Sequence, residues 1–357
     1  MSYLDNIRRV VPYVPGEQPG AGSEIIKLNT NECPYPPSPG VLKALGGMDA
    51  DSLRLYPSVT AAPLARAIAG YYGFDEDEIF VGVGSDDVLA DCFLTFFASD
   101  KPVLFPDITY SFYDVWADLY KIPYVTKPLN DAFEIEADDY TGTENGGIVI
   151  ANPNAPTSLA LPLDKIEAIV RSNPASVVIV DEAYVDFGAE SALPLLRRYD
   201  NVIVVRTFSK SRAFAGMRIG FAIGNKELIK YLSDVKFSIN SYTMNQPAIA
   251  GGIANIEDEA YFREIVSKVI KSRERAKNEL IKLGFNCLDS STNFLFASHR
   301  EKRAEDIFEY LKSRNIYVRY FKKPRIDNHL RISIGTDEQM DKLILALKGF
   351  LLQTSKV

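Results

Sequence analysis

Residues 201–224 read "NVIVVRTFSKSRAFAGMRIGFAIG", two β-rich runs joined by a loop that carries hydroxyl groups, a lysine and an arginine. At the end of the first run lie Thr207, Ser209 and Lys210, and Arg218 lies near the start of the second run. A lone lysine in a loop needs no special explanation. A lysine that closes an apolar strand beside hydroxyl groups suggests instead that a ligand binds at the end of that strand.

The same alternation of apolar runs and helical segments extends toward the N-terminus. Strands are predicted at "EIFVGVG" (78–84), "KPVLFP" (101–106), "IPYVTKP" (122–128), "GGIVIAN" (146–152) and "SVVIVDEAY" (176–184), with helices at 63–73, 85–98, 110–120, 163–172 and 193–199. Short Val/Ile-rich strands that alternate with helices are typical of a mainly parallel sheet flanked by right-handed crossover helices. The predicted class is therefore α/β.

Beyond about residue 245 the pattern changes. A long charged helix is predicted at 257–284, followed by a mixture of shorter elements: strands at 293–298, 316–321 and 330–335, a helix at 305–315 and a C-terminal helix from Asp337. This mixture suits a smaller α+β domain. We expect a large cofactor-binding domain over residues 31–250, and a small domain built from residues 1–30 and 251–357.

The composition excludes several classes of function. The 357 residues carry a formal net charge of −7 without any basic block, which disfavours broad nucleic-acid binding. Two histidines and three scattered cysteines disfavour a metal site, a Ser-His-Asp hydrolase and a disulfide framework. No signal peptide and no apolar run of about 20 residues is present. We expect a soluble, cytoplasmic protein without a metal and without a membrane partner.

Other polar side chains follow the ends of the predicted strands, where ligands bind in open α/β sheets. Ser85 and Asp86 follow "VGVG", and Ser85 is also a candidate N-cap of the next helix. Asn154 follows "IVIAN", and Asp181 and Tyr184 end "VVIVDEAY". Each residue alone has an ordinary explanation: a tight turn, a helix cap, an ion pair or packing.

Together these residues match the needs of one cofactor. A phosphate group needs a helix N-terminus, hydroxyl groups and a guanidinium, and the chain offers Ser85, Asp86, Thr207, Ser209 and Arg218. The remaining needs are an acid for a protonated pyridine ring, a donor for a phenolic oxygen and an amine for an aldehyde, which Asp181, Tyr184 and Lys210 can supply. Pyridoxal 5'-phosphate requires all four features: a phosphate site, an acid, a hydrogen-bond donor and an amine.

The chain also resembles a known family. "NPNAPTS" (152–158), "DEAYVDF" (181–187) and the lysine segment, in this order, resemble the fold-type-I pyridoxal-phosphate aminotransferases. More narrowly, the chain is similar to the histidinol-phosphate aminotransferase branch over nearly its whole length, through "PYVPG" (12–16), "LNTNECPYPPSP" (28–39), "LYPSV" (55–59), "GVGSDDVL" (82–89), "ITYSFY" (108–113) and "LRISIGT" (330–336).

The resemblance implies a role for each cofactor residue. Lys210 forms the Schiff base with the cofactor and then moves the proton at the substrate's Cα, Asp181 pairs with the ring nitrogen, and Tyr184 donates to the ring oxygen O3'. Tyr110 stacks on the ring. The phosphate is surrounded by Ser85, Asp86, Thr207, Ser209 and Arg218.

Further residues are implied at the substrate side and at a subunit interface. Arg331, assisted by Arg319, holds the acidic end of the substrate, while Tyr13 and Asn31 line the entrance. Tyr56 reaches the cofactor phosphate of a neighbouring subunit, so a homodimer is expected.

One position departs from the family pattern. The family commonly reads "NPNNPTG", and the Asn beside the second Pro is expected at O3'. Here Ala155 occupies that position, and Ser158 replaces the glycine. Either Asn154 takes over the contact or Tyr184 acts alone.

The expected reaction converts imidazole-acetol phosphate and glutamate into histidinol phosphate and 2-oxoglutarate, as in histidine biosynthesis. One planar guanidinium can bind a phosphate or a carboxylate, so Arg331 can serve both half-reactions. Threonine-phosphate decarboxylases and aromatic aminotransferases share the scaffold and stay open as alternatives. An effector-sensing half of a transcription regulator would need a DNA-binding domain and a basic patch, and neither is visible in the sequence.

Overall fold

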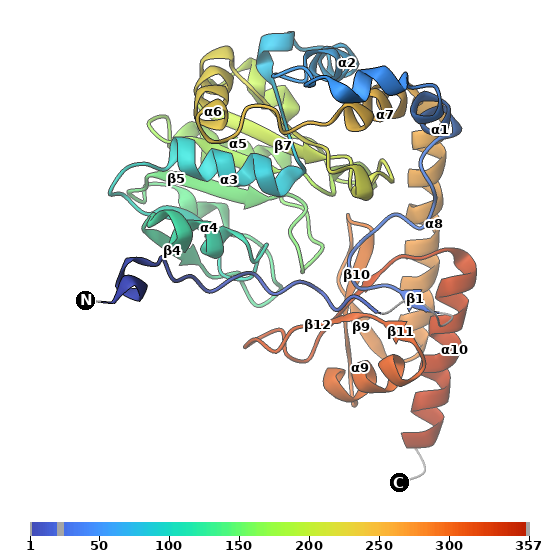
Figure 1. Cartoon of the computed structure of the whole chain (residues 1–357). Helices are drawn as coiled ribbons and strands as arrows, with labels where there is room; N and C mark the ends of the chain where they lie inside the picture. The colour runs from blue at the N-terminus through green and yellow to red at the C-terminus, as the bar shows by residue number, and fades with distance from the viewer. Residues whose placement is uncertain (1, 20–24, 355–357) are drawn as a thin grey trace.

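The larger part of the molecule is built around a seven-stranded sheet (Figure 1). The structure is a computed structural model, and it describes residues 2–19 and 25–354. The strands lie in the order β2-β8-β7-β6-β5-β3-β4. Their bounds are β2 (Ile79–Gly82), β3 (Val103–Pro106), β4 (Tyr124–Lys127), β5 (Gly147–Ala151), β6 (Val178–Asp181), β7 (Val202–Thr207) and β8 (Gly220–Gly224). Strands β7, β6, β5, β3 and β4 pair in parallel, whereas β8 is antiparallel to both β7 and β2.

The prediction of a mainly parallel sheet is therefore confirmed. The antiparallel step arises because residues 208–219 return the chain directly to the neighbouring position, without the helical crossover that a parallel pair needs. This return loop carries Lys210 and ends one residue after Arg218, which places both at the edge of the sheet where the parallel strands end.

Helices cover both faces of this sheet. They are α1 (Pro39–Gly46), α2 (Ala62–Tyr72), α3 (Ser85–Phe96), α4 (Tyr113–Tyr120), α5 (Leu163–Ser172), α6 (Lys226–Ile239) and α7 (Gln246–Glu257). Alternate residues of one strand face different cores: Val149 packs with α3 and α4, whereas Ile148 and Ile150 pack with α5. This two-sided burial explains why the strands read as continuous apolar runs rather than as alternating ones.

A second, smaller body lies beside the first (Figure 1). Its antiparallel sheet has the order β12-β13-β10-β9, and a short parallel pair joins β1 to β11. The bounds are β1 (Ile26–Lys27), β9 (Phe285–Cys287), β10 (Phe294–His299), β11 (Ile316–Tyr317), β12 (Arg319–Tyr320), β13 (Leu330–Ser333), α8 (Glu259–Lys282), α9 (Ala304–Ser313) and α10 (Asp337–Thr354). Ile26 and Leu28 share the core of this body with residues from 266 to 350, so the start of the chain packs against its end.

Three local predictions need correction. Ser85 is the first helical residue of α3 and Gly84 is the N-cap, because its φ of 89° is readily adopted only by glycine. The predicted helix at 193–199 is a short 3-10 turn, Leu193–Arg197. The predicted strand at 316–321 is two strands of different sheets, interrupted at Val318.

The division into residues 31–250 and residues 1–30 with 251–357 stays a prediction, and residues 1, 20–24 and 355–357 fall outside the described ranges. Within residues 2–19 and 25–354, no helix is long and apolar enough to span a membrane. Nor does any group of three or more His, Cys, Asp or Glu side chains in those ranges form a candidate metal site.

Candidate active site

A pocket of about 180 Å³ lies at the carboxyl ends of β5, β6 and β7 and at the N-terminus of α3. Its walls contain eight of the residues singled out from the sequence: Ser85, Asp86, Tyr110, Asp181, Tyr184, Ser209, Lys210 and Arg218. They come from segments that are up to 133 residues apart in the chain, between Ser85 and Arg218. The sheet topology brings them together because parallel strands end at one edge.

Lys210 presents a primary amine to this pocket. The preceding loop is shaped by the Thr207 hydroxyl, which accepts from the Ser209 N–H at 3.1 Å and donates to the Ile219 carbonyl at 3.2 Å. The Lys210 Nζ donates to the Thr30 carbonyl at 3.3 Å and lies 5.7 Å from the centroid of the Tyr184 ring. Thr207 itself is buried beneath the loop rather than on the pocket wall, so in this structure it orders the loop.

Asp181 places a buried carboxylate at another wall. Its Oδ2 accepts from the Tyr113 hydroxyl at 2.8 Å, and its Oδ1 accepts from the Ala183 N–H at 3.2 Å. Burial raises the pKa of Asp181 to about 6, although the Tyr113 hydrogen bond opposes the shift. Because no cation of the described residues forms an ion pair with it, this carboxylate favours a positively charged group inside the pocket.

The third feature is an anion cup, formed by the N-terminal turn Gly84–Ser85–Asp86 of α3 together with Ser209 and Arg218. Arg218 donates to the Ser209 hydroxyl at 3.3 Å and lies 3.5 Å from Asp86, whose other oxygen accepts from the Tyr110 hydroxyl at 2.7 Å. A Cβ at Gly84 would lie 2.4 Å from the Arg218 guanidinium. The free N–H groups of a helix start, a hydroxyl and a guanidinium are the donors that a phosphate needs.

Asn31 and Tyr184 connect the pocket to the smaller body. The Asn31 side-chain amide donates to the Tyr184 hydroxyl at 2.9 Å, and its oxygen accepts from Ser333 at 2.7 Å. Asn31 is almost fully buried and is not on the pocket wall. In this structure Asn31 thus holds the Tyr184 hydroxyl from the side of the smaller body, and its place at the substrate entrance stays a prediction.

Arg331 is a partly buried guanidinium with incomplete pairing. It donates to the Asn29 carbonyl at 2.9 Å, while its enclosed Nε has no acceptor among the described residues, and it lies over the rings of Phe294 and Phe321 at 5.4 and 5.6 Å. Burial lowers its pKa, an effect that the nearby Tyr184 opposes. A partly buried cation without a carboxylate partner among the described residues is suited to an anionic ligand.

Arg319 and Tyr13 lie together on a neighbouring cavity of about 500 Å³. Arg319 donates to the carbonyls of Val14 and Pro15, each at 3.3 Å, and the Tyr13 ring stacks on Phe112 with centroids 4.1 Å apart. The N-terminal segment, through Tyr13, thus packs against Phe112, two residues after Tyr110.

Besides Thr207, two further predicted cofactor residues are not in the pocket, Asn154 and Tyr56. The Asn154 amide bonds to Thr109, Thr157 and the Ile108 carbonyl, and the residue lines a different cavity. Ala155 lines the pocket instead. Tyr56 is 81% exposed and packs on Tyr242, with centroids 4.7 Å apart.

Several site residues were missed from the sequence. Tyr113 could have been noticed as the second tyrosine of "ITYSFY", but only the fold shows that it reaches Asp181. Glu32 lines the pocket and accepts hydrogen bonds from Lys27 and Thr30, both at 2.7 Å. These bonds lower its pKa although burial acts in the opposite direction.

The sequence model of the family described as "Aminotransferase class I and II" matches residues 23–347. The chain belongs to this family. A histidinol-phosphate aminotransferase 1 of Hydrogenovibrio crunogenus is 54% identical to this aminotransferase over 345 residues, which cover 97% of this chain and 96% of that one. The histidinol-phosphate aminotransferase of Lactococcus lactis subsp. cremoris is 50% identical over 356 residues, covering 100% and 99%.

A solved structure also resembles this aminotransferase. The histidinol-phosphate aminotransferase from Sinorhizobium meliloti, in complex with pyridoxal-5'-phosphate, superposes with a TM-score of 0.83 at 26% identity, covering 90% of this chain and 89% of that one. The family resemblance and the fold expected from the sequence are thereby confirmed.

Proposed function

We propose that this aminotransferase transfers an amino group between glutamate and imidazole-acetol phosphate, giving 2-oxoglutarate and histidinol phosphate, with pyridoxal 5'-phosphate as its cofactor. The relatives that cover 97–100% of the chain at about 50% identity are named histidinol-phosphate aminotransferases. The structural observation that carries the proposal is the convergence of an amine, a buried carboxylate and an anion cup on one pocket.

The residues present fit the cofactor. Lys210 would hold its aldehyde, Asp181 its ring nitrogen and the anion cup its phosphate. Bound there, pyridoxal phosphate supplies an electron sink for the electrons that remain when the substrate's Cα–H bond breaks. The unpaired buried carboxylate supports this assignment, because pairing with a protonated ring nitrogen compensates the cost of burying Asp181.

The protein's own groups then divide the work. The Lys210 amine takes up and returns the Cα proton, a general-base role that its place in the pocket allows. Because Asn31 donates to the Tyr184 oxygen, the Tyr184 hydroxyl hydrogen stays available to donate toward the pocket. With Ala155 at the pocket wall and Asn154 directed elsewhere, Tyr184 acts without an asparagine at the ring oxygen.

The anionic ends of the substrates are assigned to Arg331. Its Nε lacks an acceptor, and Arg319 and Tyr13 lie on the adjoining cavity. A planar guanidinium binds phosphate and carboxylate with the same two-donor geometry, so both histidinol phosphate and glutamate can use it.

The proposal includes a cytoplasmic homodimer. Large apolar side chains close to Tyr56 in the sequence are exposed, namely Leu53, Leu55 and Val59, and so is Tyr242, with which Tyr56 stacks. Exposed apolar surface of this kind is typical of an interface. In the dimer, Tyr56 would complete the phosphate site of the partner subunit.

Single-turnover spectroscopy of the yellow cofactor-loaded enzyme tests the substrate. Histidinol phosphate should bleach the absorbance of the bound cofactor faster than phenylalanine or threonine phosphate, and 2-oxoglutarate should restore it. The fastest bleaching with phenylalanine would favour an aromatic aminotransferase, and carbon dioxide released from threonine phosphate would favour a decarboxylase. Either result would refute the proposed substrate.

A further inference from the structure

On the side of α3 away from the pocket, a partly buried ion pair joins α3 to α6. Adjacent carboxylates in the first turn of α3 point to different sides: Asp86 bonds to Tyr110 and Arg218 at the pocket, whereas Asp87 bonds to Lys236 of α6. The Lys236 Nζ lies 2.6 Å from the Asp87 Oδ2. The pocket and this ion pair therefore share one helical turn.

The same oxygen of Asp87 also holds the loop that leads into α3. It accepts from the Val83 N–H at 2.8 Å, and a Cβ at Gly82 would lie 2.9 Å from it. The carboxylate is thus packed directly against the turn whose next residue is the N-cap Gly84. A shift of Asp87 would shift the N–H groups that face the pocket, because all of them belong to one short stretch of backbone.

Lys236 is committed to this contact. Its side chain is only 5% exposed, and its remaining ion-pair partner is Asp91, 3.4 Å away and one turn further along α3. Burial raises the pKa of Asp91 to about 6, and Lys236 opposes the shift. One ammonium therefore compensates the buried carboxylate of Asp91 and the partly buried carboxylate of Asp87, and its loss would leave like charges four residues apart on one helix.

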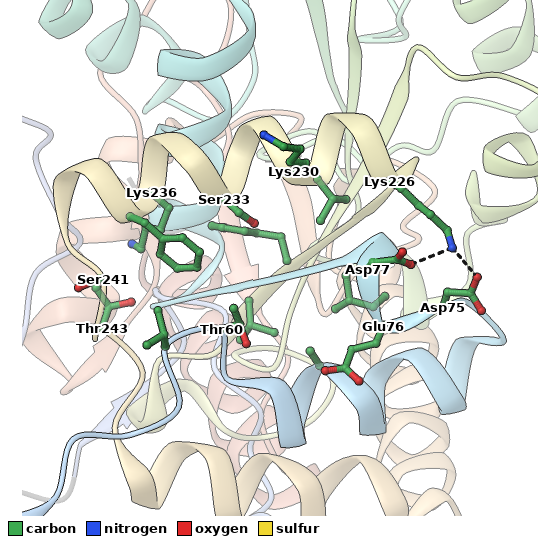
Figure 2. A pocket seen from close by; sticks show the side chains of 17 residues that line it. Thr60, Asp75, Glu76, Asp77, Lys226, Lys230, Ser233, Lys236, Ser241 and Thr243 are labelled. Atoms are coloured by element: carbon green, nitrogen blue, oxygen red, sulfur yellow. Dashed lines mark hydrogen bonds and ion pairs between the residues drawn. The ribbon is translucent and has the colours of Figure 1, made fainter.

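Lys236 lies at one end of a cavity of about 730 Å³ between α6 and β2 (Figure 2). The other lysines of this wall are engaged elsewhere: Lys226 pairs with Asp75 and Asp77, and Lys230 pairs with Asp234 of its own helix. Lys230 is 67% exposed. Lys230 therefore provides a control on the same helix and the same cavity without a contact to α3.

We propose that Lys236 is a positioning residue for cofactor binding, which acts through Asp87 to hold the Val83–Asp86 turn in the geometry that accepts a phosphate. This inference rests on the proposed function, since it assigns the anion cup to the cofactor phosphate. The dependence is specific: Lys236 supports the binding of the phosphate group and leaves the binding of the pyridine ring to Asp181 and Lys210.

The test compares pyridoxal 5'-phosphate with pyridoxal, which lacks the phosphate. Dissociation constants for both are measured on cofactor-depleted protein by the fluorescence of its single tryptophan, Trp116, whose ring lies 6.3 Å from Tyr110. The ratio of the two constants is the phosphate preference. It is determined for the wild type and for Lys236→Met, Asp87→Asn, Asp91→Asn and Lys230→Met.

Lys236→Met and Asp87→Asn should each reduce the phosphate preference at least about tenfold, because both break the charge-assisted bond that fixes the turn. Their affinity for pyridoxal should stay within about threefold of the wild type. Asp91→Asn and Lys230→Met should keep the preference, since neither residue bonds to the turn. Thermal unfolding of each variant shows separately whether stability has changed.

An unchanged preference in Lys236→Met and Asp87→Asn would overturn the inference, even if both variants were less stable. An equal loss in Asp91→Asn would also overturn it, because charge burial alone would then explain the effect. If Lys236→Met does not fold, the phosphate preference of Asp87→Asn tests the inference: a reduced preference supports it, and an unchanged preference overturns it. A wild-type protein that binds pyridoxal as tightly as pyridoxal 5'-phosphate would refute the proposed function itself. Variants that keep the phosphate preference of the wild type would instead overturn only the role of Lys236.

Discussion

Asp181, the residue proposed to pair with the cofactor ring, lowers the stability of the cofactor-free protein. Its folded pKa of about 6 lies above the ordinary value of 3.8, because the carboxylate is buried. Between these two values the folded protein binds more protons than the unfolded chain. The free energy of unfolding contributed by Asp181 therefore falls as pH rises through this window, and the cost is fully present above pH 6.

Asp181→Asn should consequently stabilise the cofactor-free protein while weakening cofactor binding. Above pH 6 the gain in unfolding free energy should approach roughly 2–3 kcal/mol, and it should vanish below about pH 4. Urea unfolding at a series of pH values measures it. If the variant is less stable than the wild type at pH 7, and by an amount that does not depend on pH, then burial does not raise the pKa of Asp181.

Arg331 is the residue on which the substrate assignment depends. Arg331→Ala should slow both half-reactions, by on the order of 2–4 kcal/mol or roughly 30- to 1,000-fold in kcat/KM. Arg331→Lys should recover only part of this, because a point charge lacks the planar fork. Arg319→Ala should affect histidinol phosphate more than glutamate. Single-turnover rates with both substrates give the answer, and an intact half-reaction in Arg331→Ala would disprove a shared anion site.

The decisive element is the pair β7–β8 with the return loop between them. Gly220 of β8 pairs with Thr207 of β7 and with Gly82 of β2. A Cβ at Gly220 would lie 2.2 Å from the Gly84 carbonyl carbon and 2.3 Å from the Ser85 nitrogen. The missing side chain thus allows the N-terminus of α3 to lie directly on the sheet.

Gly220→Ala should therefore destabilise the protein by about 1–3 kcal/mol and weaken cofactor binding, because backbone atoms must move. Gly216→Ala is the matched control, since an added Cβ there meets nothing within 4 Å. Urea unfolding and cofactor titration of the two variants test this. Equal behaviour of both would mean that the close approach of β8 to α3 is unimportant.

Elements with a clear pattern of apolar residues were predictable from the sequence. Elements whose bounds depend on contacts with distant parts of the chain were not. Strand β6 (Val178–Asp181) is buried along its whole length, so its Val/Ile run indicates a strand within the predicted range 176–184. The interruption at Val318 was missed because residues 316 and 319 pair with different sheets. Helix α6 was also missed, and with it Lys236, whose partners on α3 lie up to 149 residues earlier in the chain.

The same distinction applies to the site. Lys210 and Asp181 could be located at the ligand-binding edge of the sheet, because Asp181 ends β6 and Lys210 follows the end of β7 by three residues. Asn154 lies at the same edge, yet its amide turns toward Thr109 and Thr157. Which way a short polar side chain turns depends on hydrogen-bond partners that a linear sequence does not reveal.

At the scale of the whole molecule, the proposed dimer predicts that active sites are shared between subunits. Lys210→Ala and Tyr56→Ala should each be nearly inactive. When the two variants are unfolded, mixed and refolded, half of the dimers should carry both lesions in one site and none in the other. Activity should then return to about a quarter of the wild-type level. No recovery, despite dimers seen by sedimentation, would place Tyr56 in its own subunit's site.

Lys210 is the amine proposed to bind the cofactor. Reduction of the cofactor-loaded enzyme with borohydride makes that linkage permanent, and peptide mapping by mass spectrometry then identifies the modified residue. A phosphopyridoxyl group is expected on the Lys210 peptide, and this product should be lost in Lys210→Ala. A phosphopyridoxyl group on any other lysine, or none on Lys210 in a yellow and active enzyme, would contradict this role of Lys210.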